Sequence, residues 1–136
     1  MAITRPRTLL LQGTLCAGLG EGAGFTGLEW VRSEFREKLG FEPYPGTFNL
    51  RMDVPSLRKA RRLLSRQPGI RIDPAPGFCA AKCFHVVLDD RVTGAVVIPE
   101  VDDYPADKLE VISAVPVRTT LGAGDGDTLV IRVVCL

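Results

Sequence analysis

The chain has 136 residues, 46% of them hydrophobic, which is enough for one compact core and too little for two ordinary domains. With 17 basic and 16 acidic side chains the formal net charge is only +1, so no overall field attracts nucleic acid or an anionic membrane surface. No apolar run approaches the roughly 18 residues of a membrane-spanning helix, and we expect a single cytoplasmic domain covering residues 1–136.

The first predicted elements are a buried strand, Thr8–Ala17, and an amphipathic helix from about Leu28 to Leu39. Apolar residues recur at helical spacing in the helix, and charged residues face away from them. Gly40 follows at the position where a glycine commonly ends a helix. Between the strand and the helix lies GLGEGAGF, residues Gly18–Phe25, with four glycines in seven positions.

A turn at Pro45–Gly46 leads into a short predicted strand, Thr47–Met52, and then into a second helix capped by Asp53 or Ser56. The apolar side of this helix carries Leu57, Ala60, Leu63 and Leu64. Its remaining surface carries Arg58, Lys59, Arg61, Arg62 and Arg66. This basic surface could contact RNA or phosphate, but no aromatic residues are interleaved for base stacking, so we favour a solvated outer face.

From Gly77 onward the chain reads as almost entirely β. The predicted strands are Cys79–Asp89, Thr93–Pro99, Lys108–Val115 and Thr128–Val134. Asp89–Asp90 predicts a hairpin turn, and Pro116–Leu121 predicts one helical turn. Six strands with one or two peripheral helices indicate a mainly β protein built as a small closed barrel.

The four cysteines, Cys16, Cys79, Cys83 and Cys135, each lie among apolar residues, as reduced core cysteines do. Cys79 and Cys83 with His85 could form a metal cluster, but the spacing is not C-x-x-C and no second ligand pair follows. We interpret His85, the only histidine, as a strand residue and not as a ligand or a catalytic base.

The glycine loop is the clearest candidate site. Residues Gly18–Ala23 fit the dinucleotide pattern G-x-G-x-x-A, but the chain lacks the alternating βα units that this pattern requires. The G-x-x-x-x-G-K-[ST] phosphate loop and the protein-kinase motifs are absent. Unshielded backbone N–H groups ahead of a helix N-terminus still form an anion cradle. The alternative is a plain flexible turn.

Four segments are informative together: GLGEGAGF, LGFEPYPGTFNLRM, GAVVIPEVDDY and LEVISAVPVRTTLGAGDGDTLVIRV. In this order and spacing they resemble the archaeal CTP-dependent riboflavin kinase family, over nearly the whole chain. The strongest piece is Pro45–Asn49 following Leu39–Pro43. The resemblance implies a six-stranded cradle-loop (RIFT-type) barrel. It also implies transfer of the γ-phosphate of CTP to the ribityl 5′-hydroxyl of riboflavin, which gives FMN and CDP.

The resemblance assigns two segments to the nucleotide. The glycine loop would hold the phosphates through Gly18, Leu19, Gly20, Glu21, Gly22 and Ala23. The second segment comprises Val115, Pro116, Val117 and Arg118. Backbone groups of the second segment could read the edge of cytosine, and the Arg118 guanidinium could reach a phosphate or the base.

Thr47 and Asn49 match the family's Mg²⁺ ligands. Two residues spaced i, i+2 on a strand point to the same face, as ligands of one ion must. Both are neutral oxygen donors, which suits an ion that takes its negative ligands from substrate phosphates. Without the resemblance, the simpler reading is that both side chains satisfy the turn after Pro45–Gly46.

Glu110 falls where the family places a glutamate beside the flavin's ribityl chain. It alternates with apolar neighbours, and it is the best candidate to orient the attacking hydroxyl or accept its proton. An exposed strand glutamate is the alternative reading. No strong base is obligatory, because phosphoryl transfer depends mainly on positioning and charge neutralisation.

Asp102 departs from the family, which commonly has a flavin-site threonine there that hydrogen-bonds the product phosphate. A carboxylate ~4 Å from a phosphate costs about 4 kcal/mol at an effective dielectric constant near 20. Asp102 could point to solvent from a shifted loop, it could help to bind metal, or the acceptor could be a different alcohol.

We therefore expect a monomeric, Mg²⁺-dependent, CTP-using flavokinase that binds no nucleic acid and no membrane. The first alternative is a non-catalytic CTP- or flavin-binding regulatory module, and the second is a kinase acting on a different small alcohol. A DNA-binding regulator with a small barrel fold is a third alternative, against which the near-zero net charge argues.

Overall fold

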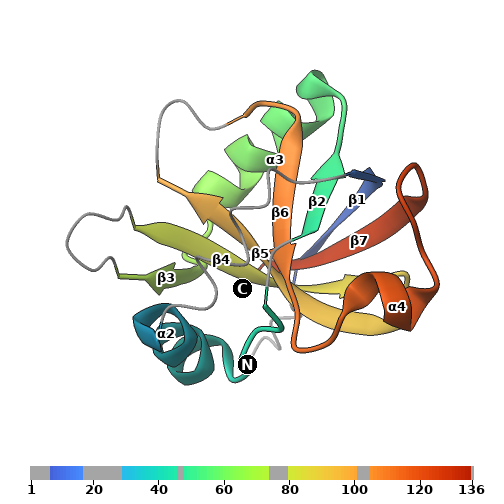
Figure 1. Ribbon diagram of the computed structural model, residues 1–136. Helices are drawn as coiled ribbons and strands as arrows, with labels where there is room; N and C mark the ends of the chain where they lie inside the picture. Colours follow the sequence, from blue (N-terminus) through green and yellow to red (C-terminus); the bar gives the residue numbers. More distant parts are fainter. Residues whose placement is uncertain (1–6, 17–28, 46–47, 74–79, 101–104, 136) are drawn as a thin grey trace, which may run out of the picture.

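The computed structural model describes residues 7–16, 29–45, 48–73, 80–100 and 105–135, and it is mainly β with three helices in these ranges (Figure 1). In chain order the elements are β1 (Arg7–Cys16), α2 (Glu29–Leu39), β2 (Phe48–Arg51), α3 (Val54–Ser65), β3 (Ile70–Ile72), β4 (Ala81–Leu88), β5 (Val92–Pro99), β6 (Lys108–Ile112), α4 (Val117–Leu121) and β7 (Thr128–Cys135).

Six antiparallel strands form a closed barrel in the order β4-β5-β6-β2-β1-β7, and β7 pairs back onto the second half of β4. This confirms the barrel expected from the strand count. The short strand β3 pairs with the first half of β4, on the edge that β7 uses further along. The sequence-based prediction missed β3, because three residues are too few to show a periodic pattern.

Two apolar clusters lie on opposite faces of the barrel wall. The interior cluster contains Phe84 and Val86 of β4 and is covered at one end by α3 through Leu57 and Leu64. The outer cluster lies between α2 and the barrel wall. Its members include Val31, Phe35, Leu39, Cys83, Ala95, Val97 and Ile112. Because both faces of the middle of β5 are covered here, Ala95–Val97 reads as a continuous apolar run.

The ends of the helices follow the expected local chemistry. Gly40 follows α2 with φ of +84°, a left-handed conformation that favours glycine. The Asp53 carboxylate caps α3 by accepting a hydrogen bond from the Ser56 amide N–H at 2.9 Å. The hairpin turn is also confirmed, since Asp89 and Asp90 have φ values of 48° and 55°, as a type I′ turn requires.

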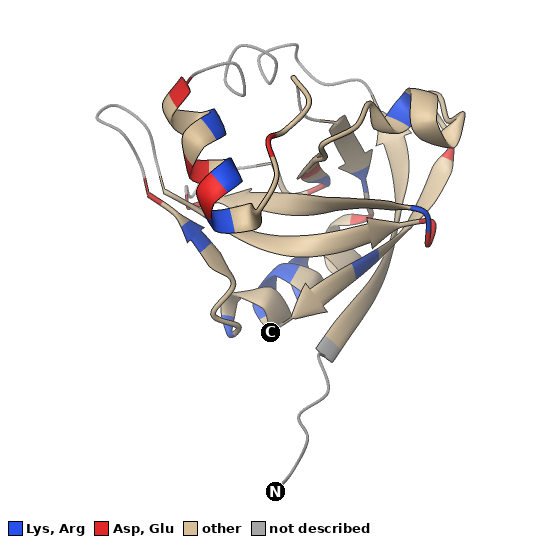
Figure 2. Ribbon diagram, turned by 90° about the horizontal axis from the view of Figure 1, so that it is seen from below, with Lys and Arg blue, Asp and Glu red and all other residues tan. Residues whose placement is uncertain are grey.

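The two longer helices differ in charge: α2 carries both acidic and basic residues, whereas all the charged residues of α3 are basic (Figure 2). Arg58, Lys59, Arg62 and Arg66 are exposed, as expected. Two expectations for α3 were wrong. Leu63 is 41% exposed, because the buried stripe follows the i, i+3, i+7 spacing of Leu57, Ala60 and Leu64. Arg61 is half-buried, and its guanidinium donates hydrogen bonds to the backbone carbonyls of Pro105 and Lys108.

The described cysteines, Cys16, Cys83 and Cys135, are free thiols, as expected. Burial raises the pKa of the Cys83 thiol to about 12, so this residue is an unreactive part of the core. His85 is an exposed residue of β4. Cys79 lies outside the described residues, and within them no group of three or more His, Cys, Asp or Glu could hold a metal ion.

Helices that could span a membrane were sought over the same residues. None of the helices described there is sufficiently long and apolar to do so.

Candidate functional site

A row of four residues crosses β1, β2, β6 and β5 on the outer face of the barrel. Cys16 lies opposite Asn49, Asn49 opposite Glu110, and Glu110 opposite Val97. Residues directly opposite on neighbouring strands share a face. The chain neighbours of these residues, including Leu15, Leu50, Leu109 and Val111, point into the barrel interior. The row therefore points outward, and it runs from the α2-covered Val97 to the described end of β1.

The centre of this row is polar although it is largely enclosed. Asn49 is only 6% exposed, and Asn49 and Ser113 are the buried polar residues of the described chain. The backbone carbonyl of Asn49 points to β1, where its oxygen lies 3.6 Å from the Cys16 sulfur. Asn49 and Glu110 are then a non-hydrogen-bonded pair, whose Cα atoms lie about 4.5 Å apart. The pairing brings a carboxamide and a half-buried carboxylate together, and both are suitable ligands for a hard cation.

Arg118 connects α4 to the same end of β1. Its guanidinium donates a hydrogen bond to the Cys16 carbonyl oxygen at 3.3 Å, across 102 positions of the chain. The same guanidinium pairs with the Asp125 carboxylate at 2.6 Å. The positively charged Arg118 guanidinium therefore lies at the end of β1, where the sequence continues into the glycine-rich segment.

A cavity of about 280 Å³ lies beside α4. It is lined by Tyr44, Pro45, Phe48, Ser113, Val115, Pro116, Val117, Arg118 and Thr119. Its volume is close to the lower end of the range for small-molecule sites, about 300 Å³. Phe48 lines this cavity and packs against the interior cluster, so it lies on the opposite face of β2 from Asn49.

Ser113 organises the wall of this cavity. Its hydroxyl donates a hydrogen bond to the Thr93 carbonyl at 2.8 Å and accepts one from the Val115 amide N–H at 3.3 Å. Its carbonyl accepts a hydrogen bond from the Tyr44 amide N–H at 2.7 Å. These contacts hold the segment after α2 against the turn that precedes α4.

The family model CTP-dep_RFKase, described as "Domain of unknown function DUF120", matches residues 15–133. The chain belongs to this family. A protein of Pyrobaculum islandicum named "Riboflavin kinase" is 41% identical over 93% of this chain and 61% of its own length. Proteins of the same name from Archaeoglobus fulgidus and Pyrobaculum calidifontis are 41% and 43% identical, over 55% and 60% of their lengths. The chain thus spans about three fifths of the length of these relatives.

The structure of this CTP-dep_RFKase family member brings together several of the residues expected to form the site. Asn49 and Glu110 are direct cross-strand neighbours. Val115–Arg118 lines the adjacent cavity, and Arg118 also reaches the end of β1. Eight expected site residues lie outside the described residues: Gly18, Leu19, Gly20, Glu21, Gly22, Ala23, Thr47 and Asp102.

Sequence reasoning missed several residues of this region in the CTP-dep_RFKase chain. Phe48 lies between Thr47 and Asn49, and Cys16 lies two residues before Gly18, so closeness in sequence to expected site residues was an available signal. Ser113 and Asp125 act through contacts with Thr93 and Arg118. No local pattern marks such contacts. They depend on how distant segments pack together.

Proposed function

We propose that this chain is a CTP-dependent riboflavin kinase domain, which transfers the γ-phosphate of CTP to the ribityl 5′-hydroxyl of riboflavin and yields FMN and CDP. The observation that carries the proposal is the pairing of Asn49 with Glu110 beside Cys16, whose carbonyl accepts the Arg118 hydrogen bond. Membership of the CTP-dep_RFKase family and relatives named riboflavin kinase support it. In this proposal residues 1–136 form one monomeric catalytic domain.

The nucleotide would lie between two segments of the chain. Gly18–Ala23 would hold the phosphates through backbone N–H groups, and Val115–Arg118 would hold the cytosine in the cavity beside α4. The Arg118–Asp125 ion pair is partly exposed, with side-chain exposures of 40% and 62%, so it is weak enough to exchange for a phosphate. Arg118 would thereby stabilise charge on the phosphate chain.

Thr47 and Asn49 would bind Mg²⁺. The Asn49 carboxamide fits this role, because it is nearly buried and lies beside a carboxylate, which together make an all-oxygen donor set. The ion supplies charge neutralisation at the phosphates. Glu110 would orient the ribityl hydroxyl toward the γ-phosphate and accept its proton.

The decisive experiment mixes purified protein with riboflavin, Mg²⁺ and either CTP or ATP, and follows FMN by chromatography. We expect FMN with CTP and not with ATP. Absence of FMN together with thermal stabilisation by CTP would instead support the regulatory module. If CTP is consumed with another alcohol but not with riboflavin, the result would support the alternative of a kinase acting on a different small alcohol.

Replacing Glu110 with glutamine should lower FMN formation by roughly 10²-fold, because the amide still fills the space but no longer accepts a proton well. CTP binding, measured by calorimetry, should change little. Glu37→Gln, on the exposed face of α2, is the matched control and should retain full turnover. Full activity of Glu110→Gln would show that Glu110 does not accept the proton of the ribityl hydroxyl.

Replacing Asp102 with threonine should slow the release of FMN. At ~4 Å the Asp102 carboxylate would repel the product phosphate by about 4 kcal/mol at an effective dielectric constant near 20, and the substitution removes this repulsion. Release can be followed by the change in flavin fluorescence on dilution. Unchanged release would show that Asp102 does not face the phosphate.

A further inference from the structure

Over its first half, β1 has one edge with which no strand of the described residues pairs. β1 pairs with β7 from Arg7 to Thr14, but it pairs with β2 only over Thr14–Cys16. The Leu15 amide N–H donates to the Asp127 carbonyl, and the Leu15 carbonyl accepts from the Gly126 amide, so odd-numbered backbone groups face the β7 side. Strand alternation directs the backbone groups of Leu10 and Gln12 to the opposite edge. No described strand pairs with that edge.

Within the described part of the chain, this edge lacks a strand partner because β2 ends early. Continued antiparallel pairing would place Asp53 opposite Gln12 and Pro55 opposite Leu10. Asp53 instead caps α3, and Pro55 lies in the first turn of that helix. The chain therefore turns away from β1, and α3 stands across from its edge.

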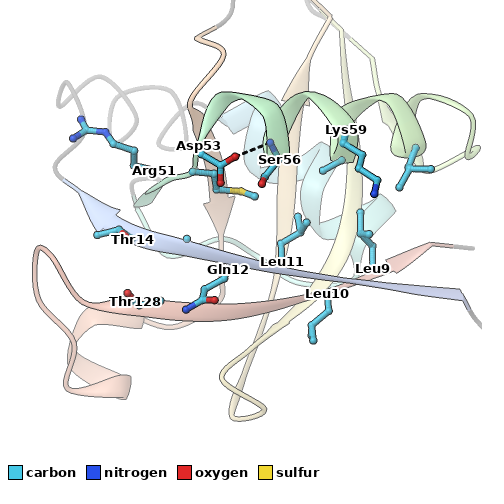
Figure 3. A pocket seen from close by; sticks show the side chains of 14 residues that line it. Leu9, Leu10, Leu11, Gln12, Thr14, Arg51, Asp53, Ser56, Lys59 and Thr128 are labelled. Atoms are coloured by element: carbon cyan, nitrogen blue, oxygen red, sulfur yellow. Dashed lines mark hydrogen bonds between the residues drawn. The ribbon is translucent and has the colours of Figure 1, made fainter.

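The result is a cleft of about 550 Å³ between β1 and α3, which we call the β1–α3 cleft (Figure 3). Leu9 and Leu11 point into it from β1, and Lys59 extends toward β1 from the helix. Leu63 of α3 also lines the cleft and is 41% exposed. Neither Asn49 nor Glu110 lines it, so the cleft is separate from the proposed catalytic site.

We propose that the β1–α3 cleft binds an extended peptide with alternating apolar and acidic residues, which adds to β1 as a further strand. The peptide backbone would hydrogen-bond with Leu10 and Gln12, in the manner of strand addition to an exposed sheet edge. Side chains on one face of the added strand would lie beside Leu9 and Leu11, and those on the other face beside Leu10 and Gln12. Leu10 is 63% exposed and offers apolar contact on that second face.

The basic side chains that line the β1–α3 cleft favour an acidic peptide over other possible occupants. α3 has no acidic residue, and its Lys59 lines the cleft together with Arg51 of β2, whose guanidinium forms an exposed 3.8 Å ion pair with Asp107. The Asp53 carboxylate, which also lines the cleft, is engaged with the Ser56 amide. A second copy of β1 (RTLLLQGTLC) contains no carboxylate, so it does not complement these cations.

The test uses a fluorescein-labelled peptide of six alternating valine and glutamate residues, with binding followed by fluorescence anisotropy. We expect saturable binding that weakens at least tenfold when glutamate is replaced by lysine. Two further peptides carry N-methyl groups on one set of alternate amides each. One of them should bind at least tenfold more weakly than the other, because only one set of amides faces β1.

The matched protein variants are Lys59→Glu, which lines the cleft, and Arg62→Glu, which is exposed on α3 outside it. We expect Lys59→Glu to weaken binding at least tenfold and Arg62→Glu to leave it within twofold. Equal loss in both variants, or equal binding of both N-methylated peptides, would overturn the proposal. Absence of saturable binding of the valine–glutamate peptide would also overturn it, whether or not the protein is found to self-associate through this cleft.

Discussion

Replacing Asn49 with alanine should lower FMN formation from CTP by about 10²- to 10³-fold, the range seen when one preorganised polar contact to reacting groups is removed. Asn49 is only 6% exposed and lies directly opposite Glu110, so little room is left for water to take the place of its carboxamide. The fold should survive, because the backbone of residue 49 still pairs with β1 and β6. Steady-state kinetics with riboflavin, alongside thermal unfolding, provide the measurement.

The dependence on Mg²⁺ distinguishes a metal ligand from a general packing role. If Asn49 binds the ion, the alanine variant should need a higher Mg²⁺ concentration for half-maximal activity, while its unfolding temperature stays close to that of the unaltered protein. His85→Ala, an exposed substitution on β4, is the control and should retain turnover. Unchanged turnover in Asn49→Ala would remove Asn49 from the metal site.

Replacing Gly94 with alanine should destabilise the barrel by about 2–3 kcal/mol, as overpacking a closely packed core does. A Cβ atom at Gly94 of β5 would lie 2.4 Å from the Ile112 carbonyl oxygen of β6, which is backbone and cannot rotate away. The two strands would have to separate where Ala95 pairs with Ile112. For a chain of this length we expect the unfolding temperature to fall by roughly 10 °C.

Gly124→Ala is the matched control for the Gly94 substitution. A Cβ atom at Gly124 meets nothing within 4 Å, so this variant should unfold within about 1 °C of the unaltered protein. Urea titration gives the free energies of unfolding of both variants. Equal stability of the two would show that β5 and β6 are not held as closely as the backbone geometry indicates.

The strands and helices were largely predictable, because local patterns determine them. Val31, Phe35 and Leu39, spaced i, i+4 and i+8, mark the buried face of α2, and Gly40 marks its end. The expected Asp89–Asp90 turn and the expected helical turn at Pro116–Leu121, observed as α4, also depend on a few adjacent residues. Local patterns failed where an element was very short, as in β3, or where a long side chain found partners elsewhere, as Arg61 did.

The amino-acid sequence by itself determined that this chain builds a mainly β barrel, and its resemblance to a kinase family named Asn49, Glu110 and Arg118 as residues to examine. Only the tertiary structure decided that Asn49 and Glu110 are cross-strand neighbours and that Arg118 reaches Cys16. It also decided that no described strand pairs with one edge of the first half of β1. The physical reason is that strand register and barrel closure join residues tens of positions apart, through contacts that no local periodicity encodes.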